Sequence, residues 1–341
     1  MTGSAEVSAG GHVPRPDGTG GGRVPDFFIV GHPKCGTTAL YEMLRRHPAI
    51  FMPDFKEPWF FAEDLQPRFP REHVGPTPQT LGDYLGLFAA AGDRLAGEAS
   101  SCYLLSRRAA EQIAEASPGA RAIAIFRQPA EFLRSLHEQL LLDHIESERD
   151  LRRALELEPE RRAGRSVPER SPIPQMLLYS DYVRYAEQLV RYREALGAER
   201  VLVLIYEEFR SDNAAALRRV QSFLGVEEQP LELLEANSSD RSMRSQRLDA
   251  MLNDVAVGNT PVTRRVKRAV KLLLPRRART SAMRAVRRNL VFAPPRPPDE
   301  ELMAELRVRF AEEVDALGEC LGRDLGAVWG QPAGAAQTTS S

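Results

Sequence analysis

The residues from Pro25 to Arg46 constrain the fold more than any other part of the chain. Asp26–Val30 is a short apolar run, which predicts a buried strand. Ala39–Arg46 carries apolar side chains at helical spacing, which predicts a helix. The loop between them, Gly31–Thr38, is punctuated by glycine. Such a strand–loop–helix unit points backbone N–H groups and the positive end of a helix dipole at one place, which is typical of a site for an anion such as phosphate.

The loop differs from the Walker A motif of nucleotide triphosphatases. Gly31 and Gly36 allow close approach of the backbone, and Lys34 adds a positive charge. In Walker A a lysine directly follows the second glycine, and a Ser or Thr then holds magnesium. Here Thr37 takes the position of that lysine, and Lys34 lies two residues before Gly36. The loop therefore predicts an anion site of another kind.

Strands and helices alternate along the rest of the chain. We expect strands over 94–100, 121–127 and 200–206, and helices over 81–91, 106–116, 129–142, 179–196 and 213–224. Residues 48–80 are irregular, and 146–170 reads as a charged helix followed by a loop. The alternation predicts an α/β fold with a central parallel sheet flanked by helices on both faces. Ligands bind such sheets at the carboxyl ends of the strands, where the Lys34 loop, Arg127 and Tyr206 fall.

The motif P-K-x-G-T-T between strand and helix resembles the 5′-phosphosulfate loop of sulfotransferases that use 3′-phosphoadenosine 5′-phosphosulfate (PAPS). The resemblance runs from about Asp26 to Trp329 and is to the heparan-sulfate-type and bacterial branch of that family. It implies a P-loop-NTPase-like sulfotransferase fold, PAPS as cosubstrate, 3′,5′-ADP as product and no metal. It also implies that Lys34 stabilises the departing 5′-phosphate. The other implied donor contacts in this loop are Cys35, Gly36, Thr37 and Thr38.

The resemblance places a second phosphate site after the strand over 121–127. In the family an arginine at a strand end and a serine in the next helix hold the 3′-phosphate, and Arg127 and Ser135 match that pattern. Arginine suits this role because its planar fork binds phosphate oxygens in pairs. A basic late loop in the family closes over the nucleotide, and Arg241 and Arg244 are its candidates here.

The acceptor side rests on Lys56-Glu57-Pro58-Trp59-Phe60-Phe61. This segment is similar to the K-E-x-x-F-F element whose glutamate is the family's general base, which implies that role for Glu57. Partial desolvation beside aromatic rings is expected to raise the pKa of that carboxyl. Glu98 matches the glutamate of a second element, G-E-x-[ST]-P-x-Y, although Ala99 stands where some branches have a lysine that Lys56 would then replace. His137 is a further, weaker candidate for the acceptor site.

Composition bounds the remaining possibilities. The 341 residues carry a net charge of −1, which gives no overall bias toward nucleic acid. The three cysteines are widely spaced, so no disulfide framework or metal cluster is expected, and a reducing cytoplasm is the predicted location. Residues 1–23 are rich in Gly and Ser and lack the apolar core of a secretory signal, so they and 331–341 are predicted to be disordered tails. Residues 24–330 are expected to form a single sulfotransferase domain.

Residues 255–298 form a basic segment with twelve Lys or Arg and no acidic residue. Val262, Val266 and Val270 recur at helical spacing, which predicts a basic amphipathic helix in this segment. Three interpretations remain open. The segment is a cationic lid near an anionic ligand, a peripheral membrane contact through 262–290, or an exposed helix neutralised by the acidic remainder.

Three functions therefore compete. The first is a PAPS-dependent sulfotransferase that acts on a hydroxyl in preference to an amine. The second is a P-loop nucleotide kinase or NTPase, which the missing Gly-Lys-Ser/Thr and the arginine at the end of the 121–127 strand disfavour. The third is a non-catalytic binder that uses the basic segment. The acceptor is left open among small molecules, carbohydrates, carrier-bound chains and lipid-linked groups.

Overall fold

The computed structural model describes residues 23–65, 77–169, 171–231, 242–243, 292–293 and 297–330. Arg241, Arg244, both predicted tails apart from Arg23, and nearly all of the basic segment lie outside the described residues. The chain divides into two compact units, and each is described by itself. Among the described residues, the first unit contains 23–65, 77–126 and 185–231, and the second contains the rest.

The first unit is built on a parallel sheet with the strand order β2-β3-β1-β4-β5. Its strands are β1 (Phe27–Gly31), β2 (Ile50–Phe51), β3 (Leu95–Ala99), β4 (Arg121–Phe126) and β5 (Val201–Ile205). All four strand pairs are parallel. The predicted α/β fold with a central parallel sheet is thereby confirmed.

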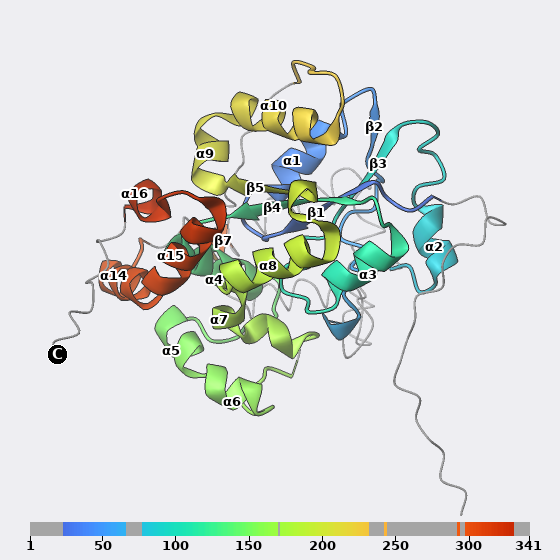
Figure 1. The fold of residues 1–341 in the computed structure, drawn as a ribbon. Helices are drawn as coiled ribbons and strands as arrows, with labels where there is room; N and C mark the ends of the chain where they lie inside the picture. The colour runs from blue at the N-terminus through green and yellow to red at the C-terminus, as the bar shows by residue number, and fades with distance from the viewer. Residues whose placement is uncertain are drawn as a thin grey trace, which may run out of the picture. The chain divides into compact units, whose positions relative to one another are not determined.

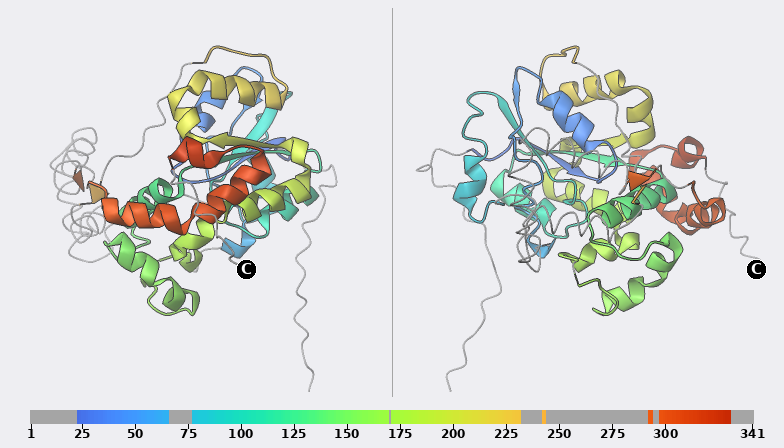
Figure 2. Two further views of the ribbon diagram at one scale, coloured as in Figure 1. Left: turned by 60° about the vertical axis from the view of Figure 1, so that its left-hand side comes forward. Right: turned by 180° about the vertical axis from the view of Figure 1, so that it is seen from behind.

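Helices cover both faces of this sheet. Figure 1 shows α1 (Thr37–Leu44), α9 (Tyr206–Ser211) and α10 (Asn213–Leu224) on one side, with α3 (Ala109–Ala116) and α8 (Tyr185–Leu196) on the other. The same layering is visible from the two directions of Figure 2. The shorter elements of this unit are α2 (Leu81–Gly86) and the 3₁₀ turns η1 (Glu63–Leu65) and η3 (Ala198–Arg200).

The central strands are apolar along their whole length because both of their faces are covered. Phe27, Phe28, Ile29 and Val30 of β1 are completely buried. So are Ile123, Ile125 and Phe126 of β4, the neighbour of β1 in the sheet. This packing fixes the carboxyl ends of β1 and β4 side by side, with the His32 N–H donating to the Ile125 carbonyl at 2.9 Å.

The second unit is mainly helical. It contains α4 (Pro129–Leu142), α5 (Leu151–Glu156), α6 (Glu158–Arg162), η2 (Pro174–Leu177), α7 (Tyr179–Tyr182), α14 (Glu300–Arg309), α15 (Ala311–Leu321) and α16 (Leu325–Trp329). Helix α14 packs against α4 and α15, and α15 packs against α16. A two-residue antiparallel pair joins β6 (Ser242–Met243) to β7 (Phe292–Ala293).

Local sequence signals explain where the best-predicted helices begin and end. Gln128 caps α4 by accepting the Glu131 N–H at 2.8 Å, and Pro129 occupies the first turn, where no N–H is needed. Asp212 caps α10 by accepting the Ala215 N–H at 2.8 Å, and Gly225 ends that helix in the left-handed conformation. Both helices have the predicted bounds.

One predicted helix was wrong. The expected single helix over 179–196 is two helices, α7 and α8, interrupted at Val183 and Arg184. The interruption falls where the chain passes from the second unit to the first. The helical spacing of apolar residues shows which side chains are buried but not which unit buries them. The spacing continues across the boundary between the units, so it predicted one helix. The helix expected over 81–91 is also shorter, since α2 ends at Gly86.

Candidate active site

The loop after β1 presents an uncapped helix N-terminus. Helix α1 begins at Thr37, and its N-cap, Gly36, has a left-handed φ of 84° and no side chain with which to cap the first turn. That turn contains no acidic residue. Thr37 is buried and Thr38 is exposed. The first N–H groups of a helix need an outside partner, so this terminus suits an anion.

Two backbone features give the loop its sharp shape. Lys34, which is half-buried, has a φ of 62°, a left-handed value that is uncommon outside glycine. Gly31 has a φ of 146°, and a Cβ at this position would lie 2.7 Å from the Ser101 carbonyl oxygen. Cys35 is buried and its N–H donates to the His32 carbonyl at 3.3 Å. The predicted donor residues 34–38 thus form one tight turn into α1.

His32 anchors this turn, although it was not among the predicted site residues. Its ring is completely buried, with Nε2 2.7 Å from the Gln188 Oε1 and ring centroids 5.5 Å from Tyr185 and 5.8 Å from Phe126. Burial lowers the pKa of His32 to about 4, against a smaller raising effect of the Gln188 hydrogen bond. His32 is therefore neutral near pH 7 and serves the packing of the loop. A histidine between a buried strand and Pro33 was the available signal.

Glu57 lies on the segment after β2, and hydrogen bonds hold it against the turn that follows β3. Its N–H donates to the Ala99 carbonyl at 3.0 Å. Its Oε2 accepts the Trp59 Nε1–H at 2.8 Å and the Ser101 N–H at 2.7 Å. Its Oε1 accepts the Ser101 Oγ–H at 3.0 Å and pairs with the Lys56 ammonium. The structure therefore pairs Lys56 with Glu57, and Ser101 holds the Glu57 carboxylate from the turn after β3.

The expected direction of the Glu57 pKa was wrong. Burial does raise this pKa, as the aromatic neighbours suggested, and it is the largest single effect. The charge of Lys56 and the hydrogen bonds from Lys56, Trp59 and Ser101 together outweigh it, so the pKa of Glu57 is lowered from its ordinary value. In the protein without ligands, Glu57 is an ionised and fully hydrogen-bonded carboxylate.

Glu98 lies in β3 and is completely buried. Its Oε2 accepts hydroxyl hydrogens from Tyr84 at 2.8 Å and Tyr103 at 2.9 Å. Burial is the largest cause and raises the pKa of Glu98 to about 7. The hydrogen bonds of Ser100, Tyr84 and Tyr103 act to lower this pKa, and the nearby charge of Glu57 acts to raise it. The role of Glu98 toward an acceptor stays a prediction, and in this structure its carboxyl belongs to the core.

The aromatic residues of the Glu57 segment divide between core and surface. Phe61 is buried and packs edge-on against Phe28 and Tyr84, with ring centroids 5.9 and 5.1 Å apart. Phe60 is half-buried and stacks on Tyr84 at 4.5 Å. Trp59 is half-buried, and its backbone N–H donates to the Ser100 Oγ at 3.1 Å. These ring contacts and the Trp59 hydrogen bond hold the segment that carries Glu57 in place.

Arg127 and Ser135 belong to the second unit. Arg127 directly follows β4, is 6% exposed, and has a guanidinium nitrogen 4.0 Å from the Glu131 carboxylate. Ser135 is half-buried on α4. Their joint use with the Lys34 loop remains a proposal, and the further donor candidates Arg241 and Arg244 lie outside the described residues.

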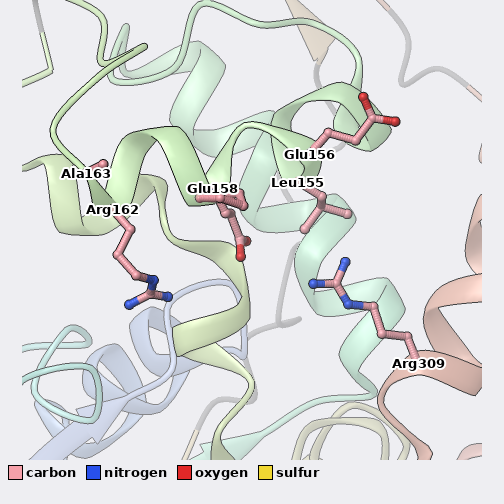
Figure 3. Close-up of a pocket in the computed structure, with 7 residues that line it drawn as sticks. Leu155, Glu156, Glu158, Arg162, Ala163 and Arg309 are labelled. Atoms are coloured by element: carbon pink, nitrogen blue, oxygen red, sulfur yellow. The ribbon is translucent and has the colours of Figure 1, made fainter.

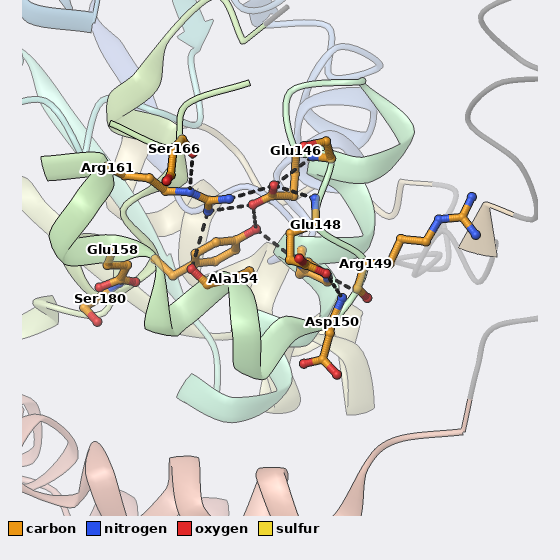
Figure 4. A network of polar contacts seen from close by, with 12 residues as sticks. Glu146, Glu148, Arg149, Asp150, Ala154, Glu158, Arg161, Ser166 and Ser180 are labelled. Atoms are coloured by element: carbon orange, nitrogen blue, oxygen red, sulfur yellow. Dashed lines mark hydrogen bonds and ion pairs between the residues drawn. The ribbon is translucent and has the colours of Figure 1, made fainter. Parts of the chain in front are cut away.

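His137 also lies on α4 and joins a buried polar network through Tyr179. Figure 4 shows the Glu146–Arg161 pair of this network. The Nδ1 of His137 is 2.8 Å from the Tyr179 hydroxyl, which donates to the Glu146 Oε2 at 3.1 Å. Glu146 also pairs with Arg161 through two hydrogen bonds of 2.7 and 2.9 Å. Burial lowers the pKa of His137. Its environment is that of a structural histidine, and an acceptor role is untested.

A hollow of about 560 Å³ in the second unit contains none of the predicted site residues. It lies between the α5–α6 segment and Arg309 at the end of α14, with Leu155 and Glu158 among its lining (Figure 3). Among the residues that the structure describes, no group of three or more His, Cys, Asp or Glu side chains is placed to hold a metal ion.

The comparisons with known proteins agree on one family. A model described as "Sulfotransferase family" matches residues 25–83, and one described as "Sulfotransferase domain" matches residues 108–267. Together these ranges cover more than half of the chain. The fold and the Lys34 loop define a sulfotransferase-type α/β protein, and the chain belongs to the sulfotransferase family.

Human carbohydrate sulfotransferase 15 is 35% identical over 82 residues, which are 21% of this chain and 13% of that protein. The human bifunctional heparan sulfate N-deacetylase/N-sulfotransferase 2 is 26% identical over 207 residues, which are 60% of this chain and 22% of that protein. The matches thus span a small part of these relatives. A crystal structure of a sulfotransferase from Alicyclobacillus acidocaldarius is 26% identical with a TM-score of 0.62, covering 89% of this chain and 98% of that one.

Proposed function

We propose that the protein transfers a sulfuryl group from PAPS to an acceptor hydroxyl and releases 3′,5′-ADP. The observation that carries this proposal is the pairing, within the first unit, of an uncapped α1 terminus beside Lys34 with the Glu57 carboxylate. The two meet through Ser101, whose N–H and Oγ hold Glu57 and whose carbonyl oxygen lies against Gly31. The anion-binding loop and the Glu57 segment therefore both lie next to the turn that follows β3.

In the proposed reaction the acceptor oxygen attacks the sulfur of PAPS. A new S–O bond forms to the acceptor, and the S–O bond to the 5′-phosphate breaks with its electron pair going to the phosphate oxygen. Glu57 takes the proton of the acceptor hydroxyl. Lys34 and the first N–H groups of α1 stabilise the charge that develops on the departing phosphate. Arg127 and Ser135 hold the 3′-phosphate, and Arg241 and Arg244 close over the nucleotide.

The acceptor class is proposed from the relatives alone. Their names describe transfer to carbohydrates and, in one case, N-sulfation of heparan sulfate. A carbohydrate hydroxyl is therefore the first acceptor to test, and a carbohydrate amine the second. Carrier-bound and lipid-linked acceptors, the latter with membrane contact through 262–290, follow as wider tests. Among the described residues every helix is too short or too polar to cross a bilayer. A cytoplasmic location stays a prediction.

Thermal unfolding with added nucleotides tests the proposed function. We expect 3′,5′-ADP to raise the melting temperature in the presence of a chelator, because a ligand at 100 times its Kd stabilises the folded state by about 2.7 kcal/mol. Protection only by ATP with magnesium would favour a nucleotide kinase or NTPase. Protection by neither would favour a non-catalytic binder. Glu57→Gln should keep the response to 3′,5′-ADP and lose sulfuryl transfer.

A further inference from the structure

The carboxylate of Glu57 has no acceptor position left for a substrate. A carboxylate offers about four lone-pair sites, two on each oxygen. Trp59 Nε1 and Ser101 N occupy those of Oε2, at 2.8 and 2.7 Å. Ser101 Oγ, at 3.0 Å, and the Lys56 ammonium occupy those of Oε1. A base in this state cannot take a proton from an acceptor until one of the four donors leaves.

Three of these donors are fixed by the fold. The Ser101 N–H is backbone, and its buried side chain is part of the turn after β3. The Trp59 ring is oriented by its own backbone, whose N–H donates to the Ser100 Oγ at 3.1 Å. The Glu57 backbone is itself fastened to the Ala99 carbonyl at 3.0 Å. Removing the Ser101 N–H would require the turn to rearrange, and the Trp59 indole and the Ser101 hydroxyl are neutral donors that a bound anion attracts less strongly than it attracts an ammonium.

Lys56 differs from the other three. Its ammonium is a compact charge on a flexible four-carbon stem, and the side chain is 20% exposed. Among the described residues, its recorded polar contact is the ion pair with Glu57. A partly exposed ion pair of this kind is held weakly, so a stronger anion nearby can take the ammonium from the carboxylate. Lys56 is therefore the donor that can leave.

We propose that Lys56 is a positioning residue that masks Glu57 in the resting protein and moves to the sulfonate of the bound donor, which exposes the Glu57 Oε1 to the acceptor. This inference rests on the proposed function. The route for coupling is short, because the Ser101 N–H holds Glu57 while the Ser101 carbonyl oxygen lies 2.7 Å from where a Cβ of Gly31, at the start of the anion-binding loop, would be. The base would then become available only when the sulfuryl group is in place.

The charges around Glu57 explain why the departure of Lys56 would change the pKa of Glu57. Lys56 is the nearest cation and lowers the pKa of Glu57, whereas burial raises it. The buried Glu98, flanked by the hydroxyls of Tyr84 and Tyr103, interacts electrostatically with Glu57. Once the ammonium has left, burial and any charge on Glu98 both act to raise the pKa of Glu57. The release therefore makes Glu57 a stronger base when it is needed.

The test is a carbon-13 NMR titration of protein labelled at the glutamate side-chain carboxyl, with the Glu57 signal assigned by its absence in Glu57→Gln. In the wild type the pKa of Glu57 should be low without ligand and should rise on addition of 3′,5′-ADP and sulfate ion. In Lys56→Met it should be high from the start and should not respond. Ser101→Ala, which removes a donor from the same oxygen, should keep the ligand response.

The matched control is Arg45→Met, which breaks an exposed ion pair with Asp54, three residues before Glu57, and should leave the Glu57 titration unchanged. Circular dichroism melting of each variant confirms that it is folded. The proposed masking by Lys56 would be wrong if the Glu57 pKa is the same in Lys56→Met as in the wild type. It would also be wrong if calorimetry shows that the wild type binds 3′,5′-ADP but its Glu57 pKa does not change. Either result would leave the proposed function standing. No nucleotide binding in calorimetry would overturn the proposed function and the release step together.

Discussion

Lys34 and Glu57 both have backbones in the left-handed region. They are the two residues to which the proposed function assigns catalytic roles. Their φ values are 62° and 60°, and Trp59 beside Glu57 has a φ of 55°. Such conformations cost on the order of 1–3 kcal/mol each in non-glycine residues and persist where the surrounding contacts enforce them. At Glu57 those contacts are the hydrogen bonds to Ala99 and Ser101. The Lys34 and Glu57 side chains are thus held in place by a backbone in an unfavourable conformation.

Replacing Lys34 with methionine tests the residue that the sequence marked first. The variant keeps the length of the side chain and loses the cation that stabilises the leaving phosphate. We expect formation of 3′,5′-ADP from PAPS to fall by about 100-fold or more, as when a preorganised charge-stabilising group is removed. Chromatography of the nucleotide products measures this, with Arg45→Met as a control. Undiminished turnover in Lys34→Met would show that another group stabilises the phosphate.

Glu98 gives the protein a pH-dependent stability of predictable sign. Its pKa of about 7 in the folded state lies above the ordinary 4.5, so folding favours the protonated carboxyl. The resulting stability is fully present below the unfolded pKa and is lost as the pH rises through 7, by about 3 kcal/mol at most. Urea unfolding should therefore show the free energy of unfolding of the wild type falling between about pH 4.5 and pH 7, with a flatter profile in Glu98→Gln. Parallel profiles would mean that Glu98 is ionised throughout.

At the level of elements, the sequence was sufficient where signals were local. The apolar runs of β1, β4 and β5, and the helical periodicity of α4 and α10, predicted these elements with bounds within one residue. The loop over 34–38 was predicted for the same reason, because glycine, lysine and threonine are informative at single positions. Element order along the chain then predicted the parallel sheet.

Contacts between distant segments could not be predicted in this way. Ser101 meets Glu57, and Gln188 meets His32, across 44 and 156 positions of sequence. The Glu146–Arg161 pair joins two residues of an excursion that the sequence showed only as charge-dense. A single sequence shows which residues are polar but not which polar groups the fold buries together. The sign of the Glu57 pKa shift was wrong for this reason.

The strand-to-loop junction at Gly31 is expected to be intolerant of a side chain. A Cβ there would lie 2.7 Å from the Ser101 carbonyl oxygen, at a φ of 146°. Gly31→Ala should destabilise the protein by about 1–3 kcal/mol in urea unfolding, because both the contact and the backbone are strained. Gly86→Ala is the matched control, since a Cβ at the end of α2 meets nothing within 4 Å. Equal stability of the two variants would contradict this reading of the junction.

The buried pair of Glu146 and Arg161 is expected to hold the second unit together. Their side chains are 0% and 1% exposed. Arg161→Met should cost about 3–5 kcal/mol, since it leaves a buried carboxylate without its cation, and Glu146→Gln in the same protein should recover part of that loss. Arg152→Met breaks the exposed pair with Glu305 and should change stability by less than about 1 kcal/mol. Similar losses from both arginine variants, measured by urea unfolding, would argue against a structural role for the buried pair.

For the whole molecule, the single domain over 24–330 stays a prediction. The described residues fall into two compact units. The division separates the proposed donor residues, since Lys34 lies in the first unit and Arg127 and Ser135 lie in the second. If one nucleotide binds all three residues, it contacts both units. Nucleotide binding is therefore expected of the whole chain and not of either unit alone.

A crystal structure of the full chain with 3′,5′-ADP is the most direct measurement of this arrangement. We expect the 5′-phosphate to lie at the first turn of α1, against Lys34, Thr37 and Thr38. The 3′-phosphate should lie against Arg127 and Ser135, with Glu57 facing the place vacated by the sulfuryl group. A nucleotide bound elsewhere, or bound with Lys34 and Arg127 directed away from it, would contradict the proposed sulfuryl transfer.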